Sequence, residues 1–232
     1  MTNHFKSSKT LSDNKQESFL VFDLETVPQA SLSNTQQLEL MRKVERSKEF
    51  DKTTEENNVE LIRKFQATSP YFGKIICIGI YFPTSEKKIA LIGEEQVILE
   101  RFWQFADSTL FTGTFVTYNG LDFDVPFILH RSMVHGIKPT HERFMDTGRY
   151  QKNGCHRDVY KMLTKYDPSA AITLDLACDI FNVPSPKNGP VRAATVYDYY
   201  LKGDINLIAE YCMKDVIATY QLYDKARYYC IN

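Results

Sequence analysis

The sequence predicts an α/β protein in which helices pack on a mixed sheet, and its order of elements and its length support this class. Three short apolar runs rich in strand-forming residues come first. A segment with helical spacing of apolar residues follows, and a fourth strand-like run precedes further helical segments. Elements in this order indicate helices layered on a mixed sheet. The length of 232 residues supports one large domain with a well-filled core, or else two small ones.

Each expected strand is a short apolar run bounded by turn residues. The strands are expected at 19–27, 74–83, 87–95 and 113–120. The turn Pro83-Thr84-Ser85 joins the second and third into a hairpin. Residues 1–17 are polar and lack periodicity, which predicts a disordered leader before a single domain at 18–232. Residues 31–70, rich in Gln, Glu, Lys and Asn, predict one or two inserted amphipathic helices.

Helical spacing of apolar residues marks the second half of the chain. The expected helices are 94–108, 123–136, 173–182 and 205–227. In the second of these, Asp124 suits the N-cap, Pro126 the first turn and Gly136 the stop. The segments 147–172 and 185–190 are expected to be loops.

Composition limits the partners and the location. The net charge is -1, so a polyanion would have to be held by metal ions or by a local basic patch. The five cysteines contain no C-x-x-C pair and suggest reduced, mostly buried thiols. The longest apolar run, 75–82, is far shorter than the about 20 residues that span a membrane. Without a signal-peptide core, the expected location is cytoplasmic.

Acidic residues interrupt apolar surroundings at two places in the first half of the chain. Asp23 and Glu25 are two apart on a strand, so their side chains point to the same face. Buried, this pair calls for a compensating cation; at a frayed strand end it would be solvated. Asp124 follows a strand-to-helix turn, where it either caps the helix or faces the end of the sheet.

A third acidic position lies in the last expected helix. Tyr211 and Asp215 form an i, i+4 pair, which puts the phenol and the carboxylate on one face. Core packing of the tyrosine and a Lys or Arg partner for the aspartate are the alternatives. Taken together, the three places supply four carboxylates, and hard oxygen ligands in this number suit two Mg²⁺ or Mn²⁺ ions. The hydroxyl of Tyr211 could orient an attacking water.

The motifs at these three places resemble those of a known superfamily. They are Asp23-x-Glu25 in VFDLETVP, Asn119-x4-Asp124 in TYNGLDFDVPFILHR, and Tyr211-x3-Asp215 in IAEYCMKDVIATYQLY. In this order they are similar to the DEDDy-type 3'-5' exonucleases of the DnaQ-like superfamily. They look most like the predicted 3'-5' exonucleases related to the proofreading domain of family-B DNA polymerases. The resemblance spans residues 18 to about 226.

The resemblance implies a ribonuclease H-like fold with a mixed five-stranded sheet, and a 3'-5' exonuclease that uses two Mg²⁺ or Mn²⁺ ions and releases nucleoside 5'-monophosphates. Asp23 would match the bridging ligand of the family. Glu25 and Asp215 would complete the site of the water-activating metal, and Asp124 would hold the second metal. Tyr211 would position the nucleophile.

Neighbours of the motifs are candidate substrate contacts. In similar enzymes the 3' nucleotide lies beside the positions of Leu24 and Thr26. Asn119 would orient Asp124 or contact the terminal nucleotide, and Phe123 would stack on a base or pack in the core.

Basic residues in two loops are further candidates. Lys187 and Arg192 would contact phosphate or lie on a solvated loop. The segments 31–70 and 147–172 would set substrate or partner specificity. The basic residues of the second segment are Lys152, Arg157, Lys161 and Lys165.

The expected partner is a nucleic acid with a free 3' end, with DNA favoured over RNA by family analogy alone. No attached polymerase domain is expected, so the enzyme would act alone or through a protein partner, and not at a membrane. One alternative is an RNA-trimming enzyme of the ribonuclease D kind, which shares the motifs. The others are a module that binds nucleic acid without turnover and a structural metal site. The histidine-type branch does not fit, because Glu210 stands where its histidine would be.

Overall fold

The structure, a computed structural model, describes residues 17–50, 55–147, 154–185 and 189–230, with the backbone alone at 55–57. Its sheet has the strand order β3-β2-β1-β4-β5. The strands are β1 (Phe19–Pro28), β2 (Gly73–Phe82), β3 (Lys87–Ile92), β4 (Thr114–Thr117) and β5 (His156–Asp158). β1, β2 and β3 pair antiparallel, whereas β4 runs parallel to both β1 and β5. The expected mixed five-stranded sheet is confirmed.

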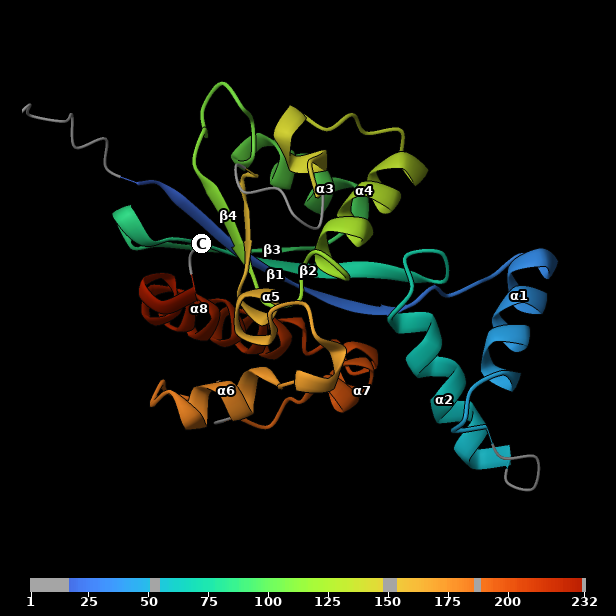
Figure 1. The fold of residues 1–232 in the computed structure, drawn as a ribbon. Coiled ribbons are helices and arrows are strands. Elements are labelled where there is room, and N and C mark those ends of the chain that lie inside the picture. The colour runs from blue at the N-terminus through green and yellow to red at the C-terminus, as the bar shows by residue number, and fades with distance from the viewer. Residues whose placement is uncertain (1–16, 51–54, 148–153, 186–188, 231–232) are drawn as a thin grey trace, which may run out of the picture.

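Helices cover both faces of this sheet (Figure 1). They are α1 (Asn34–Glu45), α2 (Glu55–Ala67), α3 (Glu95–Phe105), α4 (Asp124–Val134), α5 (Val159–Thr164), α6 (Leu174–Ile180), α7 (Val196–Leu201) and α8 (Ile205–Cys230). α3 and α4 pack on one face. α8 crosses the other, with α5, α6 and α7 against it. The expected loop at 147–172 is corrected, because it contains β5 and α5, which are too short to show a period of their own.

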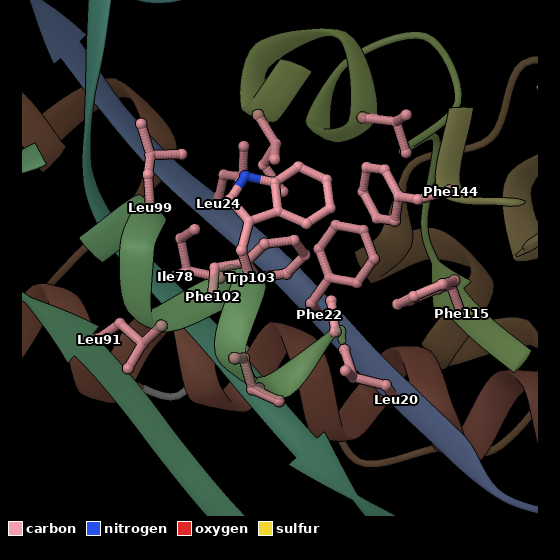
Figure 2. Packing of buried hydrophobic residues seen from close by; sticks show 14 of the residues in the cluster. Leu20, Phe22, Leu24, Ile78, Leu91, Leu99, Phe102, Trp103, Phe115 and Phe144 are labelled. Atoms are coloured by element: carbon pink, nitrogen blue, oxygen red, sulfur yellow. The ribbon is translucent and has the colours of Figure 1, made fainter. Parts of the chain in front are cut away.

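The core fixes the two faces of β1. Leu20, Phe22 and Leu24 point into an aromatic-rich cluster with α3, where Phe102 and Trp103 pack against them (Figure 2). The alternate residues of β1 face α8 instead. Burial of each large apolar side chain contributes roughly 1.5–3 kcal/mol, and a one-residue slip would exchange the faces. The direction of every side chain on β1 is therefore determined by packing on both sides.

The connection between β1 and β2 forms a helical hairpin beyond the end of these strands (Figure 1). Ser33 and Gln36 form a capping box at the start of α1, each side chain bonding the backbone N–H of the other. Leu40 on α1 and Leu61 on α2 pack in a small separate cluster with Phe72. Of the described helices, none is long and apolar enough to cross a membrane.

Candidate active site

Asp23 and Glu25 lie on the face of β1 that meets α8. Their neighbours on that face, Val21 and Val27, belong to the clusters packed against α8, whereas Leu24 points the opposite way. Glu25 is 8% exposed. The pairing of β1 with β2 shifts register between Glu25 and Thr26, which indicates a bulge directly after the acidic pair. The two carboxylates therefore lie inside the molecule and not at a frayed end.

A glycine allows α8 to approach this acidic pair. Gly79 on β2 pairs with Asp23, and a Cβ at Gly79 would come within 3.0 Å of Cys212 Sγ and of the Val216 side chain. The thiol of Cys212 is 3.4 Å from the Asp23 carbonyl oxygen and 3.8 Å from its Oδ2. A hydrogen bond with Cys77 and burial raise the pKa of the Cys212 thiol, which therefore stays protonated and donates to Asp23.

Asp124 reaches the same region from α4. Its backbone is the first residue of the helix, its side chain is 2% exposed, and Oδ1 accepts a hydrogen bond from the Leu24 backbone N–H at 3.0 Å. The expectation that Asp124 caps α4 was wrong, because Phe123 occupies the N-cap without a side-chain cap bond. The Asp124 carboxylate turns toward β1 instead of toward the N–H groups of its own helix.

The loop from β4 to α4 is held by a second buried aspartate, Asp158, at the end of β5. Its carboxylate accepts hydrogen bonds from the N–H groups of Asn119 at 2.9 Å, Leu121 at 3.0 Å and Lys161 at 3.2 Å. Asn119 has a positive φ of 59°. A Cβ at Gly120 would lie 2.4 Å from the Thr117 side chain. The chain can make this tight turn because Asn tolerates the left-handed region and Gly120 has no side chain.

Tyr211 and Asp215 lie one turn apart on α8 and share a side-chain hydrogen bond. Both are half-buried, between the buried Cys212 and Val216 and the exposed Lys214. Burial, followed by the negative charge of Asp215, raises the pKa of Tyr211 well above its usual value. The phenol therefore remains protonated at neutral pH and can donate a hydrogen bond.

Negative charges gather around Asp23 without compensation from one another. Burial raises the pKa of Asp23 and of Glu25 well above their usual values, and the charges of Asp124 and Asp215 raise both further. Burial also raises the pKa of Asp124 to about 8, with a smaller contribution from Asp158. Carboxylates from β1, α4 and α8 thus act on one another across a common site.

The donor set of this site suits a divalent cation. One oxygen each from Asp23 and Glu25 lies within 4.8 Å of the other and of Cys212 Sγ. Clustered carboxylate oxygens are the ligands that Mg²⁺ and Mn²⁺ prefer, and a bound cation would offset the charge repulsion. The fold thus implies divalent metal use at this position.

The four candidate substrate contacts surround the acidic site in different ways. The side chain of Leu24 is buried in the core, while its N–H reaches Asp124. The hydroxyl of Thr26 donates to the Ala67 carbonyl at the end of α2, at 2.7 Å. Phe123 is half-buried with its ring centroid 5.2 Å from that of Phe127, and Asn119 is half-buried in the β4–α4 loop.

The basic candidates are mostly turned away from the site. Lys152 and Lys187 lie outside the described residues. The guanidinium of Arg157 donates to the carbonyls of Gly154 and His156, and that of Arg192 donates to carbonyls of its own loop. Lys165 is exposed. Lys161 pairs with the Asp122 carboxylate beside the β4–α4 loop.

Asp158 and Cys212 are site neighbours that reasoning from the sequence missed. Asp158 stands before a short apolar stretch and caps α5, an N-cap signal that the sequence does contain. Cys212 follows Tyr211 directly, in a helix whose sheet-facing side could have been counted by periodicity. Only the fold shows what each contacts.

Comparisons with known proteins agree with this architecture, which is a ribonuclease H-like fold. The family B DNA polymerase of Pyrobaculum calidifontis superposes with a TM-score of 0.61 at 16% identity, over 90% of this chain and 24% of that one. The catalytic polypeptide of DNA polymerase epsilon from Arabidopsis thaliana is 31% identical over 149 residues, which are 59% of this chain and 6% of that protein. The chain therefore spans a small part of both relatives.

A family described as predicted 3'-5' exonucleases related to the exonuclease domain of PolB matches residues 69–230. The chain belongs to this family, and the expected relationship is confirmed. The matched segment contains Asp124, Tyr211 and Asp215. Asp23 and Glu25 precede it and are brought to the others by the position of β1 in the centre of the sheet.

Proposed function

We propose that this protein is a metal-dependent 3'-5' exonuclease that removes nucleotides from single-stranded DNA ends and releases nucleoside 5'-monophosphates. The observation that supports this most is the meeting of buried carboxylates from β1, α4 and α8 beside a tyrosine hydroxyl. Burying several acids together is unfavourable unless they bind cations, so a purely structural role explains the arrangement poorly. Membership of the exonuclease family supports the direction of cleavage.

In this proposal Asp23, Glu25, Asp124 and Asp215 would hold two Mg²⁺ or Mn²⁺ ions. Bound ions would supply activation of water and stabilisation of the leaving oxygen. Tyr211, kept protonated by burial and by Asp215, would orient the attacking water through its hydroxyl and would not serve as the base.

The substrate side of the proposal rests on neighbouring groups. The Leu24 backbone and the Thr26 side chain would border the 3'-terminal nucleotide, with Asn119 and Phe123 on the other side of the acids. DNA is favoured because the two relatives described above are named as DNA polymerases. An RNA-trimming activity is the alternative, since the acidic motifs do not distinguish the sugars. A cytoplasmic location and a protein partner stay predictions.

The proposal is tested with 5'-labelled single-stranded DNA and RNA of one sequence, each incubated with Mg²⁺, Mn²⁺, Ca²⁺ or EDTA. We expect a ladder that shortens from the 3' end with Mg²⁺ or Mn²⁺ and not with Ca²⁺ or EDTA. Mass spectrometry should identify nucleoside 5'-monophosphates as the product. Asp23→Asn, which keeps the side-chain volume, should lose the ladder.

Other outcomes select the alternatives. Faster shortening of the RNA would replace DNA by RNA as the substrate. Tight binding of the oligonucleotide with no product under any metal would contradict the enzyme and favour the non-catalytic binding module.

A further inference from the structure

A pocket of about 510 Å³ opens beside the loop that carries Asp124. Its walls are the β4–α4 loop, with Asn119 and Asp122, and α5 with the segment after it, including Tyr160, Lys161 and Tyr166. This volume falls within the ~300–1,000 Å³ of pockets that hold a small-molecule-sized group. We call it the α5 pocket.

The α5 pocket is joined rigidly to the acidic site. Asp158 accepts hydrogen bonds from Asn119 on one wall and from Lys161 on the other, so one buried carboxylate fixes both. Asp122, at the rim, is two residues from Asp124, which limits their Cα separation to about 7 Å. A strand whose end lies at the acids therefore reaches this pocket within its next residues.

The chemistry of the lining matches a nucleotide. Tyr160 and Tyr166 supply aromatic faces, on which bases of any sequence can stack. The Nζ of Lys161 lies 5.3 Å from the Tyr160 ring centroid and pairs with Asp122, whose side chain is 60% exposed. A phosphate could replace the exposed Asp122 as the partner of Lys161 without leaving a buried charge behind.

The order of strands gives the pocket a side of the scissile bond. In the sheet, β2 lies on one side of β1, while β4 and β5 lie on the other. Thr26, proposed to border the 3'-terminal nucleotide, contacts Ala67 on the β2 side. The α5 pocket lies on the β5 side, with the acids between them.

Resting on the proposed function, we propose that the α5 pocket binds the nucleoside on the 5' side of the scissile phosphate. Its base stacks against Tyr160 and Tyr166, and its phosphate pairs with Lys161. This nucleoside belongs to the strand that leaves after cleavage. The pocket thus governs how the enzyme holds a polymer, and not the chemistry at the acids.

Two substrates separate these roles. Thymidine 5'-monophosphate p-nitrophenyl ester has no nucleoside on the leaving side, whereas oligothymidylate fills the pocket. For Tyr166→Ala and Lys161→Met we expect kcat/KM on the oligonucleotide to fall about tenfold, as loss of one stacked base or one phosphate contact predicts. Hydrolysis of the ester should stay within about twofold of the wild type. Lys165→Met, in the exposed residue next to Tyr166, is the matched control and should change neither.

The two partners of the ion pair should act in opposite directions. Asp122→Asn releases Lys161 and should raise kcat/KM on the oligonucleotide, whereas a merely structural ion pair would lower it or leave it unchanged. Lys161→Met should also reduce the slope of log affinity against log salt by about 0.7, the value for one phosphate of a single strand. Equal losses on ester and oligonucleotide, or no loss on either, would overturn the proposal.

Binding assays keep the test independent of turnover. Fluorescence anisotropy of labelled oligothymidylate in Ca²⁺ should show weaker binding by Tyr166→Ala and Lys161→Met, with folding checked by thermal melts. If the wild type hydrolyses neither substrate, the exonuclease proposal fails, while weaker binding by these variants would still assign the pocket. Unchanged binding would remove it.

Discussion

The backbone N–H of Leu24 donates to Oδ1 of Asp124 over 3.0 Å and joins β1 to the start of α4 across 100 positions of sequence. Leu24 lies between Asp23 and Glu25, so this one bond sets the Asp124 carboxylate beside the acidic pair. The bond is buried, and its loss would leave the strand N–H without a partner.

Two substitutions of Asp124 should separate its structural and chemical roles. Asp124→Asn keeps an oxygen for the Leu24 N–H but loses the charge, so we expect kcat to fall on the order of a hundredfold or more while the fold persists. Asp124→Ala should lose activity and also about 1–3 kcal/mol of unfolding free energy relative to Asp124→Asn. Primer-shortening rates and denaturant unfolding check these values. Full activity in Asp124→Asn would refute the metal-ligand role.

Tyr211→Phe should lower turnover without weakening metal binding. The ring still packs on α8, but the hydroxyl that bonds Asp215 is gone, so water would be held less well. We expect kcat to fall about 10- to 100-fold and the Mn²⁺ dissociation constant to change by less than about twofold. Single-turnover kinetics and isothermal titration calorimetry measure the two quantities. A rise in the Mn²⁺ constant equal to the fall in kcat would instead make Tyr211 a support for the ligands.

Asp158→Asn should slow catalysis from outside the acidic site. The amide nitrogen of asparagine cannot accept an N–H bond, so a bond to one loop wall is lost and we expect a loss of about 1–3 kcal/mol of unfolding free energy. The shifted β4–α4 loop should also lower kcat at least about tenfold. Asp107→Asn is the control, because that carboxylate bonds the nearby Thr109 on the surface. It should stay within about 0.5 kcal/mol of the wild type.

Glu95 and Arg131 form a buried ion pair that should be costly to break. The Glu95 carboxylate accepts from Arg131 at 2.6 Å and 2.9 Å and from the Ile75 N–H at 2.7 Å, beside the bulge of β2. Glu95→Gln leaves the guanidinium uncompensated and should cost about 3–5 kcal/mol. The exposed pair of Lys64 and Glu49 offers a contrast, with about 0–1 kcal/mol expected for Lys64→Met. Urea unfolding would detect the difference, and equal losses would contradict it.

The metal-free protein should become less stable as pH rises from 6.5 to 8. Burial raises the pKa of Asp124 to about 8 and that of Asp23 well above its usual value, so the folded state binds more protons than the unfolded chain in this window. Below it, His156 has the opposite effect, because burial lowers its pKa to about 4. We expect the melting temperature in EDTA to fall by about 2–4 °C per kcal/mol lost.

Mg²⁺ should offset this loss. Metal binding needs ionised carboxylates, so its affinity should rise with pH up to about 8, with release of protons. Calorimetry in buffers of different ionisation enthalpy counts those protons. A melting temperature in EDTA that stays constant or rises from pH 6.5 to 8 would contradict the raised pKa values.

Side-chain directions along single elements were predictable because they depend on local periods. The alternation of β1 put Asp23 and Glu25 on one face, and the helical period of α8 paired Tyr211 with Asp215. The limits of α3, α4 and α8 followed from apolar spacing and stop signals. The order of three motifs also sufficed for the family, without knowledge of any contact.

The sequence by itself therefore determined the fold class, the main elements and the residues that are candidates for chemistry. Only the tertiary structure decided that Asp124 bonds β1 instead of capping α4, that β5 exists, and that Asp158 holds the β4–α4 loop. These depend on bonds between positions far apart in the chain, which leave no periodic trace in the local pattern. A three-residue strand such as β5 is specified by its pairing with β4, since its own residues are too few to show an alternation.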